Sequence, residues 1–531
     1  MKLNRAGYHQ KADWEGYILP SYDIERMTEK TREAPVWVHF GPGNIFRAYQ
    51  AILAEELLEK GLSETGIIVA GSRDTITSTY RAHDNLVLSV TLKGNGDIEK
   101  RVAAAVAESV VFDAEDAAEW LRLQEIFAAK SLQLVTFTIT EKGYSLSDQN
   151  GALRRDVARD YENGPKQPES FFGKIAALLH HRYLSSAASL ALLSNDNCSH
   201  NGEVLKKAVM AYVDKWVKNG LCEMGFKEYV MRQISFPWSM IDKITPRPDD
   251  SIRDMLKKDG LEDTETLITG RNTFTSVFVN AEEVGYLVVE DDFPNGRPAL
   301  EETGVIFTDR DTVDKVERMK VGTCLNPLHT ALAVFGCLLD YHKISDEMRD
   351  PDLKALVKNI GYKEGLKVVE DPGVLDPQTF MDTCLNERFP NPYVPDTPQR
   401  IASDTSQKIP VRYGVTYRKY VELNRQDTLR FIPFVFAGWI RYLLETDDNG
   451  NPFTISPDPL GDKLKTVVQG ASKDDLYEAL KPILSDGSIF GADLYETGVA
   501  ERVIGYYKEM CQGKGAIRKA IEKINLEEGI S

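Results

Sequence analysis

Lys320, Asn326 and His329 place an amine, an amide and an imidazole within one short segment of the chain. A lysine whose pKa is lowered by burial can take the proton of a hydroxyl group, and as an ammonium it can return that proton during reduction. Asn326 could donate a hydrogen bond to a carbonyl oxygen, where negative charge grows as hydride arrives. His329 would orient a neighbouring hydroxyl. This combination suits metal-free hydride transfer between a secondary alcohol and a ketone.

The same segment is typical of the start of a helix. The pair Asn326-Pro327 fits an N-cap and a first turn, and residues 328 to 341 are apolar and helix-forming. On one straight helix Lys320 and His329 would lie about 180° apart, since each residue turns the helix by about 100°. We therefore expect a break at Gly322, with Lys320 closing one segment and pointing back toward the opening turn of the next.

A glycine turn near the N-terminus indicates a dinucleotide-binding site. Strand-forming residues 35 to 40 lead into Gly41-Pro42-Gly43-Asn44-Ile45-Phe46-Arg47, and a helical run follows over residues 48 to 60. Gly41 and Gly43 would let the backbone approach a pyrophosphate, whose charge a helix N-terminus stabilises. Phe46 stands where the third glycine of the usual fingerprint would be, so the motif alone is weak.

Three further apolar runs end in polar loops, as the strands of a doubly wound sheet do. The first run, residues 66 to 71, ends at Ser72-Arg73-Asp74. The second, residues 132 to 140, ends at Glu141-Lys142-Gly143-Tyr144. The third, residues 189 to 194, ends at Asn195-Asp196-Asn197-Cys198. Functional groups gather at the carboxyl ends of such strands. We expect the loop that begins at Thr140 and Glu141 on the nicotinamide side of a bound cofactor.

The loop after the second strand should contact the adenosine ribose. Asp74 would accept a hydrogen bond from the ribose 2′-hydroxyl of NAD, whereas Ser72 and Arg73 would suit the 2′-phosphate of NADP. The residues of this loop are compatible with either NAD or NADP as the cofactor.

Together the motifs resemble those of the polyol-specific long-chain dehydrogenases, the mannitol dehydrogenase family. The matches follow the family order from about residue 35 to residue 412, which makes the resemblance specific. The matching segments are Gly41-x-Gly43-x-x-Phe46-Arg47-Ala48, residues 138 to 144, Asn195-Asp196-Asn197 with Asn201-Gly202, Phe236-Pro237-x-Ser239-Met240-x-Asp242-Lys243-Ile244-Thr245-Pro246, and residues 320 to 329.

The resemblance implies an α/β fold with a Rossmann-type N-terminal domain, a mainly α-helical C-terminal domain and a metal-independent active site. By it, Lys320 is the general acid/base, Asn326 and Asn197 flank the reacting oxygen, and His329 positions the substrate. Asp242 would line the substrate or proton path. Arg400 and Lys408 would bind substrate hydroxyls or a carboxylate. The residues expected to contact the cofactor, NAD with NADP not excluded, are Gly41, Gly43, Asn44, Phe46, Arg47, Arg73, Asp74, Thr140 and Glu141.

The expected substrate follows from a polar, basic segment. Arg400, Lys408 and Arg412 offer more cations than an uncharged polyol requires, and a carboxylate could pair with them. We therefore expect an NAD(P)-dependent oxidoreductase acting on CH–OH groups that interconverts fructuronate and D-mannonate. The alternatives are mannitol 2-dehydrogenase activity, a phosphorylated sugar alcohol as substrate, and a non-catalytic dinucleotide sensor.

Each of these residues also has an ordinary structural explanation. Asn326 could be only a helix cap, His329 a first-turn histidine and Lys320 a solvated lysine. Asp242 could form a surface pair with its neighbouring lysine, which would contribute almost nothing to stability. Asn197 could simply tolerate a tight turn, and residues 400 to 412 could be a solvated connector rather than a loop of the site.

Length and composition agree with a two-domain enzyme. A chain of 531 residues exceeds one ordinary core, and we expect domains at residues 1–310 and 311–531. The net charge of −17 argues against binding to nucleic acid or to an anionic membrane. The chain has no apolar signal core, which predicts a cytoplasmic protein. Its six cysteines lack CxxC spacing, so we expect neither a disulfide framework nor a zinc site. For the oligomeric state, the sequence is compatible with a monomer and with a homo-oligomer.

Overall fold

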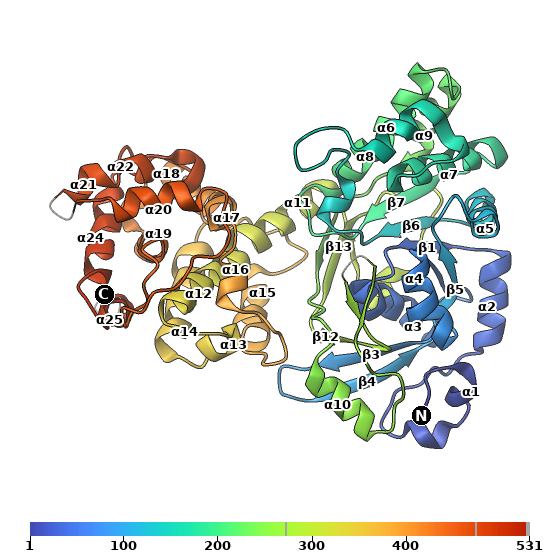
Figure 1. Cartoon of the computed structure of the whole chain (residues 1–531), viewed down its shortest axis with the longest axis horizontal. Coiled ribbons are helices and arrows are strands. Elements are labelled where there is room, and N and C mark those ends of the chain that lie inside the picture. Colours follow the sequence, from blue (N-terminus) through green and yellow to red (C-terminus); the bar gives the residue numbers. More distant parts are fainter. Residues whose placement is uncertain (271–272, 473–474, 527–531) are drawn as a thin grey trace. The chain divides into compact units, whose positions relative to one another are not determined.

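A six-stranded parallel sheet forms the centre of the first of two units, residues Met1–Asp314, in this computed structural model (Figure 1). The structure describes residues 1–270, 273–472 and 475–526. The sheet order is β5-β2-β1-β6-β7-β8, and every neighbouring pair is parallel. Counted along the chain this is the 3-2-1-4-5-6 order of the Rossmann fold. The strands are β1 (Trp37–Phe40), β2 (Ile67–Gly71), β5 (Val106–Val111), β6 (Leu134–Phe137), β7 (Leu190–Ser194) and β8 (Ile234–Ser235).

The central strands are mostly apolar because both faces of the sheet are covered, and their polar residues, His39, Thr136 and Ser194, are buried. All residues of β1, β2, β6 and β7 are buried. Alternate side chains enter two cores: Val38 and Phe40 pack with residues of α5, α7 and α8, while Trp37 packs with residues of α3. The helices of this unit are α1 (Arg5–Tyr8), α2 (Ile24–Glu33), α3 (Ala51–Glu59), α4 (Arg73–Thr75), α5 (Ala117–Ala128), α6 (Arg155–Asn163), α7 (Phe171–Ser185), α8 (Asn201–Lys218), α9 (Met224–Gln233) and α10 (Asp250–Lys258).

Smaller sheets complete the first unit. One has the order β12-β3-β4 and another the order β14-β13-β9, while β10 pairs with β11. Residues 274 to 289, which the sequence indicates as strand-rich, supply β11, β12 and most of β13. The strands are β3 (Val87–Leu92), β4 (Ile98–Ala103), β9 (Ser239–Asp242), β10 (Leu267–Ile268), β11 (Phe274–Thr275), β12 (Phe278–Glu282), β13 (Tyr286–Glu290) and β14 (Ile306–Thr308).

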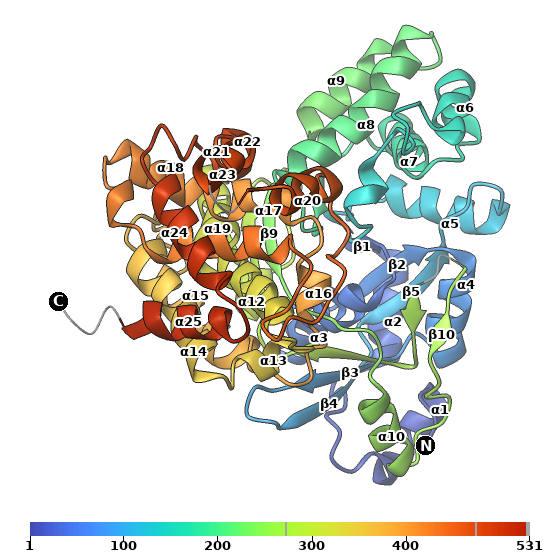
Figure 2. The same ribbon diagram turned by 60° about the vertical axis from the view of Figure 1, so that its left-hand side comes forward.

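The second unit, Lys315–Ser531, is built from helices in the residues that the structure describes. Helix α19 is buried along its whole length and packs side by side with α24 (Figure 2). The helices are α11 (Arg310–Met319), which crosses from the first unit, α12 (Asn326–Leu338), α13 (Ile344–Glu347), α14 (Pro351–Lys358), α15 (Pro377–Thr383), α16 (Pro398–Ile401), α17 (Thr405–Arg412), α18 (Gly414–Glu422), α19 (Phe431–Tyr442), α20 (Gly461–Gln469), α21 (Leu476–Ala479), α22 (Lys481–Leu484), α23 (Gly487–Phe490), α24 (Ala500–Met510) and α25 (Ala516–Leu526).

The predicted fold class, a Rossmann-type N-terminal domain with a mainly helical C-terminal domain, is confirmed. One local prediction is wrong: residues 400 to 412 are not a loop, because α16 ends and α17 forms within them. Thr397 caps α16 by accepting from the backbone N–H of Arg400 at 3.2 Å. Helix α17 tolerates Pro410 inside it. The cations expected on a flexible loop therefore project from helices.

One helical run, Arg310–Leu338, is long and apolar enough to cross a membrane by length and composition alone. Within the protein, 83% of its most apolar window is buried. The run includes α12, whose side chains pack against α16 and α19. Its apolar character is explained by this packing.

Candidate functional site

The glycine turn after β1 contains two glycines with different surroundings. Gly41 has φ +113°, and a Cβ atom there would lie 2.1 Å from the carbonyl oxygen of Thr138. The hydroxyl of Thr138 donates to the Gly41 carbonyl at 3.0 Å. At Gly43 an added Cβ would meet no atom within 4 Å, and the helix begins at the next residue. Gly41 is therefore required by the protein's own packing, while Gly43 lies open at a helix N-terminus that can receive a pyrophosphate.

The side chains that follow the turn are tied into the fold. Asn44 donates to the carbonyl of Phe274 at 3.2 Å. Phe46 is fully buried and stacks on His39 with ring centroids 4.4 Å apart. Arg47, only 1% exposed, donates to the carbonyl of Val277 at 2.9 Å. Burial gives the side chains of Phe46 and Arg47 structural roles; the cofactor contacts that the sequence suggested for both residues stay a prediction.

The loop after β2 presents an acidic and a basic side chain, both exposed. The Asp74 carboxylate accepts from the backbone N–H of Gly270 at 2.8 Å. Hydrogen bonding from Ser72, and then from Gly270, holds the pKa of Asp74 below its usual value. Arg73 forms an ion pair with Asp116. The carboxylate at this strand end is thus ionised, while the neighbouring guanidinium is already paired.

Asp196 connects the loops that follow β6 and β7. Its carboxylate accepts from the backbone N–H groups of Ile139 at 3.0 Å and Thr140 at 2.8 Å, and from the hydroxyl of Tyr144 at 2.7 Å. Thr140 is held at φ 68°, a conformation that costs free energy unless its surroundings impose it. Thr140 and Glu141 are exposed beyond this anchor. Sequence reasoning included Asp196 in a motif but missed this role.

Replacing Asp196 with alanine would leave its three hydrogen-bond donors without this acceptor. We expect the free energy of unfolding to fall by about 3 kcal/mol, since each buried donor left unpaired costs about 1–3 kcal/mol. NADH affinity should fall about tenfold or more, because the loop of Thr140 loses its anchor. Denaturant unfolding and NADH fluorescence titration measure the two effects. Asp148→Ala is the control: Asp148 also accepts from loop N–H groups, those of Asn150 and Ala152, and its loss should leave NADH affinity unchanged.

In the second unit a π-helical turn, Lys320–Cys324, joins α11 to α12. The expected break at Gly322 does not occur; instead Leu325 N–H donates to the Lys320 carbonyl at 3.1 Å. A π turn inserts an extra residue into the helix, which shifts the angle between residues on either side of it. Asn326 is the first residue of α12 and not its N-cap, which is Leu325. Lys320 is 2% exposed, so it is not a solvated lysine.

His329 lies among charged groups of the second unit. Its Nε2 is 3.3 Å from Asp396 Oδ2, although the two atoms are not aligned as a hydrogen bond. Burial, together with the nearby cations, lowers the pKa of His329 to about 3. The imidazole is therefore neutral at physiological pH, so it can orient a hydroxyl but cannot act as a cationic acid. The cations are Arg412, Arg400, Arg388 and Lys408, in order of decreasing effect.

The four cations differ in their partners. Arg400 pairs with Asp396, and Lys408 donates to the carbonyl of Ile401 at 3.0 Å. Burial, with the nearby positive charge of Arg412, lowers the pKa of Lys408 to about 8. Arg388 ends a π-helical turn, Cys384–Arg388, and is 3% exposed. Its role was missed, because nothing in the sequence indicates that this arginine is buried beside His329.

Two hydrogen bonds fasten α17 and α18 to the turn that holds Lys320. The hydroxyl of Tyr413 donates to the carbonyl of Pro327, and the hydroxyl of Thr416 donates to the carbonyl of Gly322 at 2.9 Å. The helix that carries Lys408 and Arg412 is thereby fixed against the start of α12. The second unit thus brings His329 together with Arg400 and Lys408, while Lys320 and Asn326 lie where the π turn leads into α12.

Two of the predicted catalytic and substrate-binding residues belong to the first unit. Asn197 lies in the loop after β7, with its side chain exposed. Asp242 ends β9, is 6% exposed, and stands opposite Tyr286 of β13. Neither belongs to the same unit as Lys320.

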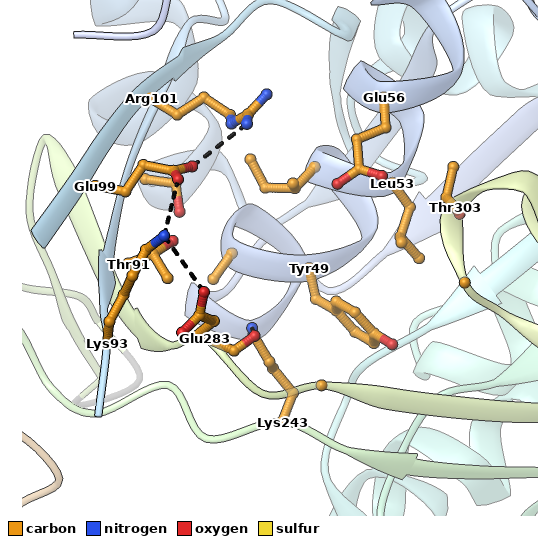
Figure 3. Close-up of a pocket in the computed structure, with 15 residues that line it drawn as sticks. Tyr49, Leu53, Glu56, Thr91, Lys93, Glu99, Arg101, Lys243, Glu283 and Thr303 are labelled. Carbon is orange, nitrogen blue, oxygen red and sulfur yellow. Dashed lines mark hydrogen bonds and ion pairs between the residues drawn. The ribbon is translucent and has the colours of Figure 1, made fainter. Parts of the chain in front are cut away.

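A pocket of about 270 Å³ opens in the first unit near α3, β3 and β4 (Figure 3). Lys93 pairs with Glu283 at 3.3 Å and with Glu99 at 3.6 Å, and Arg101 pairs with Glu99 at 3.3 Å. Because these charges neutralise one another, the pocket gives no reason to expect a charged ligand. Among the described residues, no group of three His, Cys, Asp or Glu side chains is arranged to hold a metal ion.

Comparison with known protein families covers most of the chain. A model described as the mannitol dehydrogenase Rossmann domain matches residues 36–302, and one described as the mannitol dehydrogenase C-terminal domain matches residues 312–511. The chain belongs to the mannitol dehydrogenase family. The resemblance predicted from its motifs is confirmed, as is the predicted class, an oxidoreductase acting on CH–OH groups with a nicotinamide dinucleotide cofactor.

Relatives within the mannitol dehydrogenase family differ in substrate and cofactor. The chain is 48% identical over 535 residues to a D-mannonate oxidoreductase of Thermotoga maritima, covering 99% of each chain. It is 29% identical to a polyol:NADP oxidoreductase of Gluconobacter oxydans, covering 92% of this chain and 94% of the relative. Pseudomonas fluorescens mannitol 2-dehydrogenase, solved with NAD and D-mannitol, is 26% identical and has a TM-score of 0.71, with 99% and 100% coverage.

Proposed function

We propose that this protein reduces D-fructuronate to D-mannonate and catalyses the reverse oxidation. The observation that carries this proposal is the group of four cations around the neutral His329, since an uncharged polyol has no need of it. The relative of Thermotoga maritima, a D-mannonate oxidoreductase at 48% identity, supports the same substrate class. We further propose a cytoplasmic enzyme in which residues 1–310 bind the dinucleotide and residues 311–531 bind the substrate.

Lys320 is the general acid/base of this proposal. Its ammonium gives a proton to the substrate carbonyl oxygen during reduction, and its amine takes the hydroxyl proton during oxidation. A bound nicotinamide would supply a hydride to the carbonyl carbon in reduction and accept one from the alcohol carbon in oxidation. Asn326 and Asn197 donate to the reacting oxygen as its negative charge grows. His329, neutral because it is buried, orients a substrate hydroxyl, and Asp242 lines the substrate or proton path.

NAD is the cofactor that the loop after β2 favours. The ionised Asp74 would accept from a ribose 2′-hydroxyl but would repel a 2′-phosphate, and Arg73 is occupied by Asp116. The open backbone at Gly43 fits the pyrophosphate. The further candidates for cofactor contacts are Gly41, Asn44, Phe46, Arg47, Thr140 and Glu141.

The direct test is the oxidation of NADH and of NADPH, followed by absorbance, with fructuronate, tagaturonate and fructose offered in parallel. We expect rapid NADH oxidation with fructuronate and a much slower reaction with every other combination of coenzyme and substrate. Reaction with fructose alone would instead support mannitol 2-dehydrogenase activity, the activity named for the solved Pseudomonas relative. If none of the three substrates led to oxidation of NADH or NADPH, both proposals would be rejected, and a phosphorylated sugar as substrate or a non-catalytic sensor would be favoured.

Lys408 predicts a pH dependence that is specific to the charged substrate. Because its pKa is lowered to about 8, Lys408 loses its positive charge as pH rises through that value. We expect kcat/KM for fructuronate, relative to that for fructose, to fall by about tenfold between pH 7 and pH 9. Taking the ratio removes the titration of Lys320, which both substrates share. In Lys408→Arg, which stays charged, the ratio should be flat. An equal decline in the variant would show that Lys408 is not the titrating group.

A further inference from the structure

Arg412 is a partly buried residue whose guanidinium has few partners in the part of the chain that the structure describes. Its Nη1 donates to the hydroxyl of Thr330 at 2.7 Å, and this is its one hydrogen bond to a described residue. No carboxylate among residues 1–270, 273–472 and 475–526 forms an ion pair with it. A guanidinium offers five N–H donors and keeps its charge in proteins. Most of the hydrogen-bonding capacity of this cation is therefore unused.

Two buried arginines of the chain, Arg182 and Arg441, are satisfied by the protein itself. Arg182 donates to five backbone carbonyl groups. Arg441 donates to three carbonyl groups and to the hydroxyl of Thr446. The remaining nitrogen atoms of Arg412 are not fully buried, so solvent or a ligand can reach them. The contrast indicates that the partner of Arg412 is supplied from outside the chain.

The position of Arg412 connects it with the residues proposed to act on the substrate. Its partner Thr330 follows His329 in α12 and donates to the carbonyl of Asn326 at 2.9 Å. Among the cations near His329, Arg412 has the largest effect on the pKa of the imidazole. Arg412 also lies four residues after Lys408 in α17, so the two share one face of that helix. An anion bound by Arg412 would thus lie beside Lys408 and within the group around His329.

We propose that Arg412 binds the terminal carboxylate of the sugar acid and sets the preference for a hexuronate over an uncharged ketose. This inference rests on the proposed function. A guanidinium fork matches the two oxygens of a carboxylate, which gives both strength and orientation. Fructuronate and fructose carry the same ketone and differ at the terminal carbon, a carboxylate in one and a hydroxymethyl group in the other. Arg412 discriminates between the two substrates by binding the carboxylate.

The test compares the two substrates in Arg412→Met, which keeps an apolar stem, and in Arg412→Lys, which keeps a charge without the fork. We expect Arg412→Met to lower kcat/KM for fructuronate by about 100-fold, mostly through KM, since the carboxylate lies far from the reacting carbon. The value for fructose should change by less than about threefold. Arg412→Lys should show an intermediate loss for fructuronate. Arg349→Met, at an exposed arginine paired with Asp346, is the matched control and should alter neither substrate.

Three outcomes separate this inference from its alternatives. Equal losses with both substrates in Arg412→Met would show a structural role, and unchanged fructuronate kinetics would show no role; either result overturns the inference. A wild-type protein that is inert with fructuronate would instead overturn the proposed function. If Arg412→Met does not fold, calorimetric titration of mannonate and of mannitol into the NAD-loaded wild type and Arg412→Lys decides the matter. The variant should weaken mannonate binding alone.

Discussion

Replacing Lys320 with alanine is expected to lower kcat by about a thousandfold in both reaction directions while leaving NADH affinity close to that of the wild type. Proton transfer by a positioned side chain contributes about 10²–10⁴-fold to rate, and no other group in the proposal takes over this role. The cofactor contacts we propose all lie in the first unit, whereas Lys320 belongs to the second. Steady-state kinetics and NADH fluorescence titration measure the two quantities separately.

Lys315→Ala is the matched control for this experiment. Lys315 lies in the preceding helix and pairs with Glu370 at 3.1 Å, so its loss should leave kcat within about twofold. Partial recovery of Lys320→Ala by added primary amines would identify proton transfer as the missing step. A Lys320→Ala variant that keeps more than about a tenth of wild-type kcat would contradict the assignment of the general acid/base.

Gly41→Ala is expected to remove about 3–5 kcal/mol from the free energy of unfolding and to abolish measurable NADH binding. At φ +113° an L-residue is strained, and the new Cβ would lie 2.1 Å from the backbone oxygen of Thr138. Backbone strain of this kind costs about 1–3 kcal/mol, and overpacking costs about 1–3 kcal/mol more. Denaturant unfolding and NADH titration are the measurements.

Gly43→Ala separates folding from cofactor binding at the same turn. Its added methyl group meets no protein atom within 4 Å, so the free energy of unfolding should change by less than about 1 kcal/mol. NADH affinity should still fall, because the methyl occupies the space proposed for the pyrophosphate. Normal NADH binding by Gly43→Ala would show that the pyrophosphate does not bind at this position.

The Rossmann framework was predictable because its physical signals are local. Strands buried on both faces are mostly apolar along their length, and the runs around β1, β2, β6 and β7 show this in the sequence itself. The glycine turn also has a local signature, although its two glycines differ in a way that only contacts with Thr138 reveal. The family resemblance added the helical second domain, which composition alone does not specify.

The arrangement of charges in the second unit was less predictable because it depends on contacts distant in sequence. The π turn at Lys320 replaces the expected break at Gly322, and propensity does not distinguish these two conformations. Helices α16 and α17 form in a segment rich in polar residues and prolines, where tertiary packing overrides local preference. Asp196 and Arg388 gain their roles through loops and helices that approach only in the folded chain.

The central claim is that the protein reduces a sugar acid at its ketone with NADH. The most direct measurement follows NADH absorbance and the products by NMR in one reaction of the wild-type protein with fructuronate. The proposal predicts one molecule of mannonate formed for each NADH consumed, with kcat/KM at least about 100-fold above that for fructose. Consumption of NADH with fructose but not with fructuronate would contradict the claim.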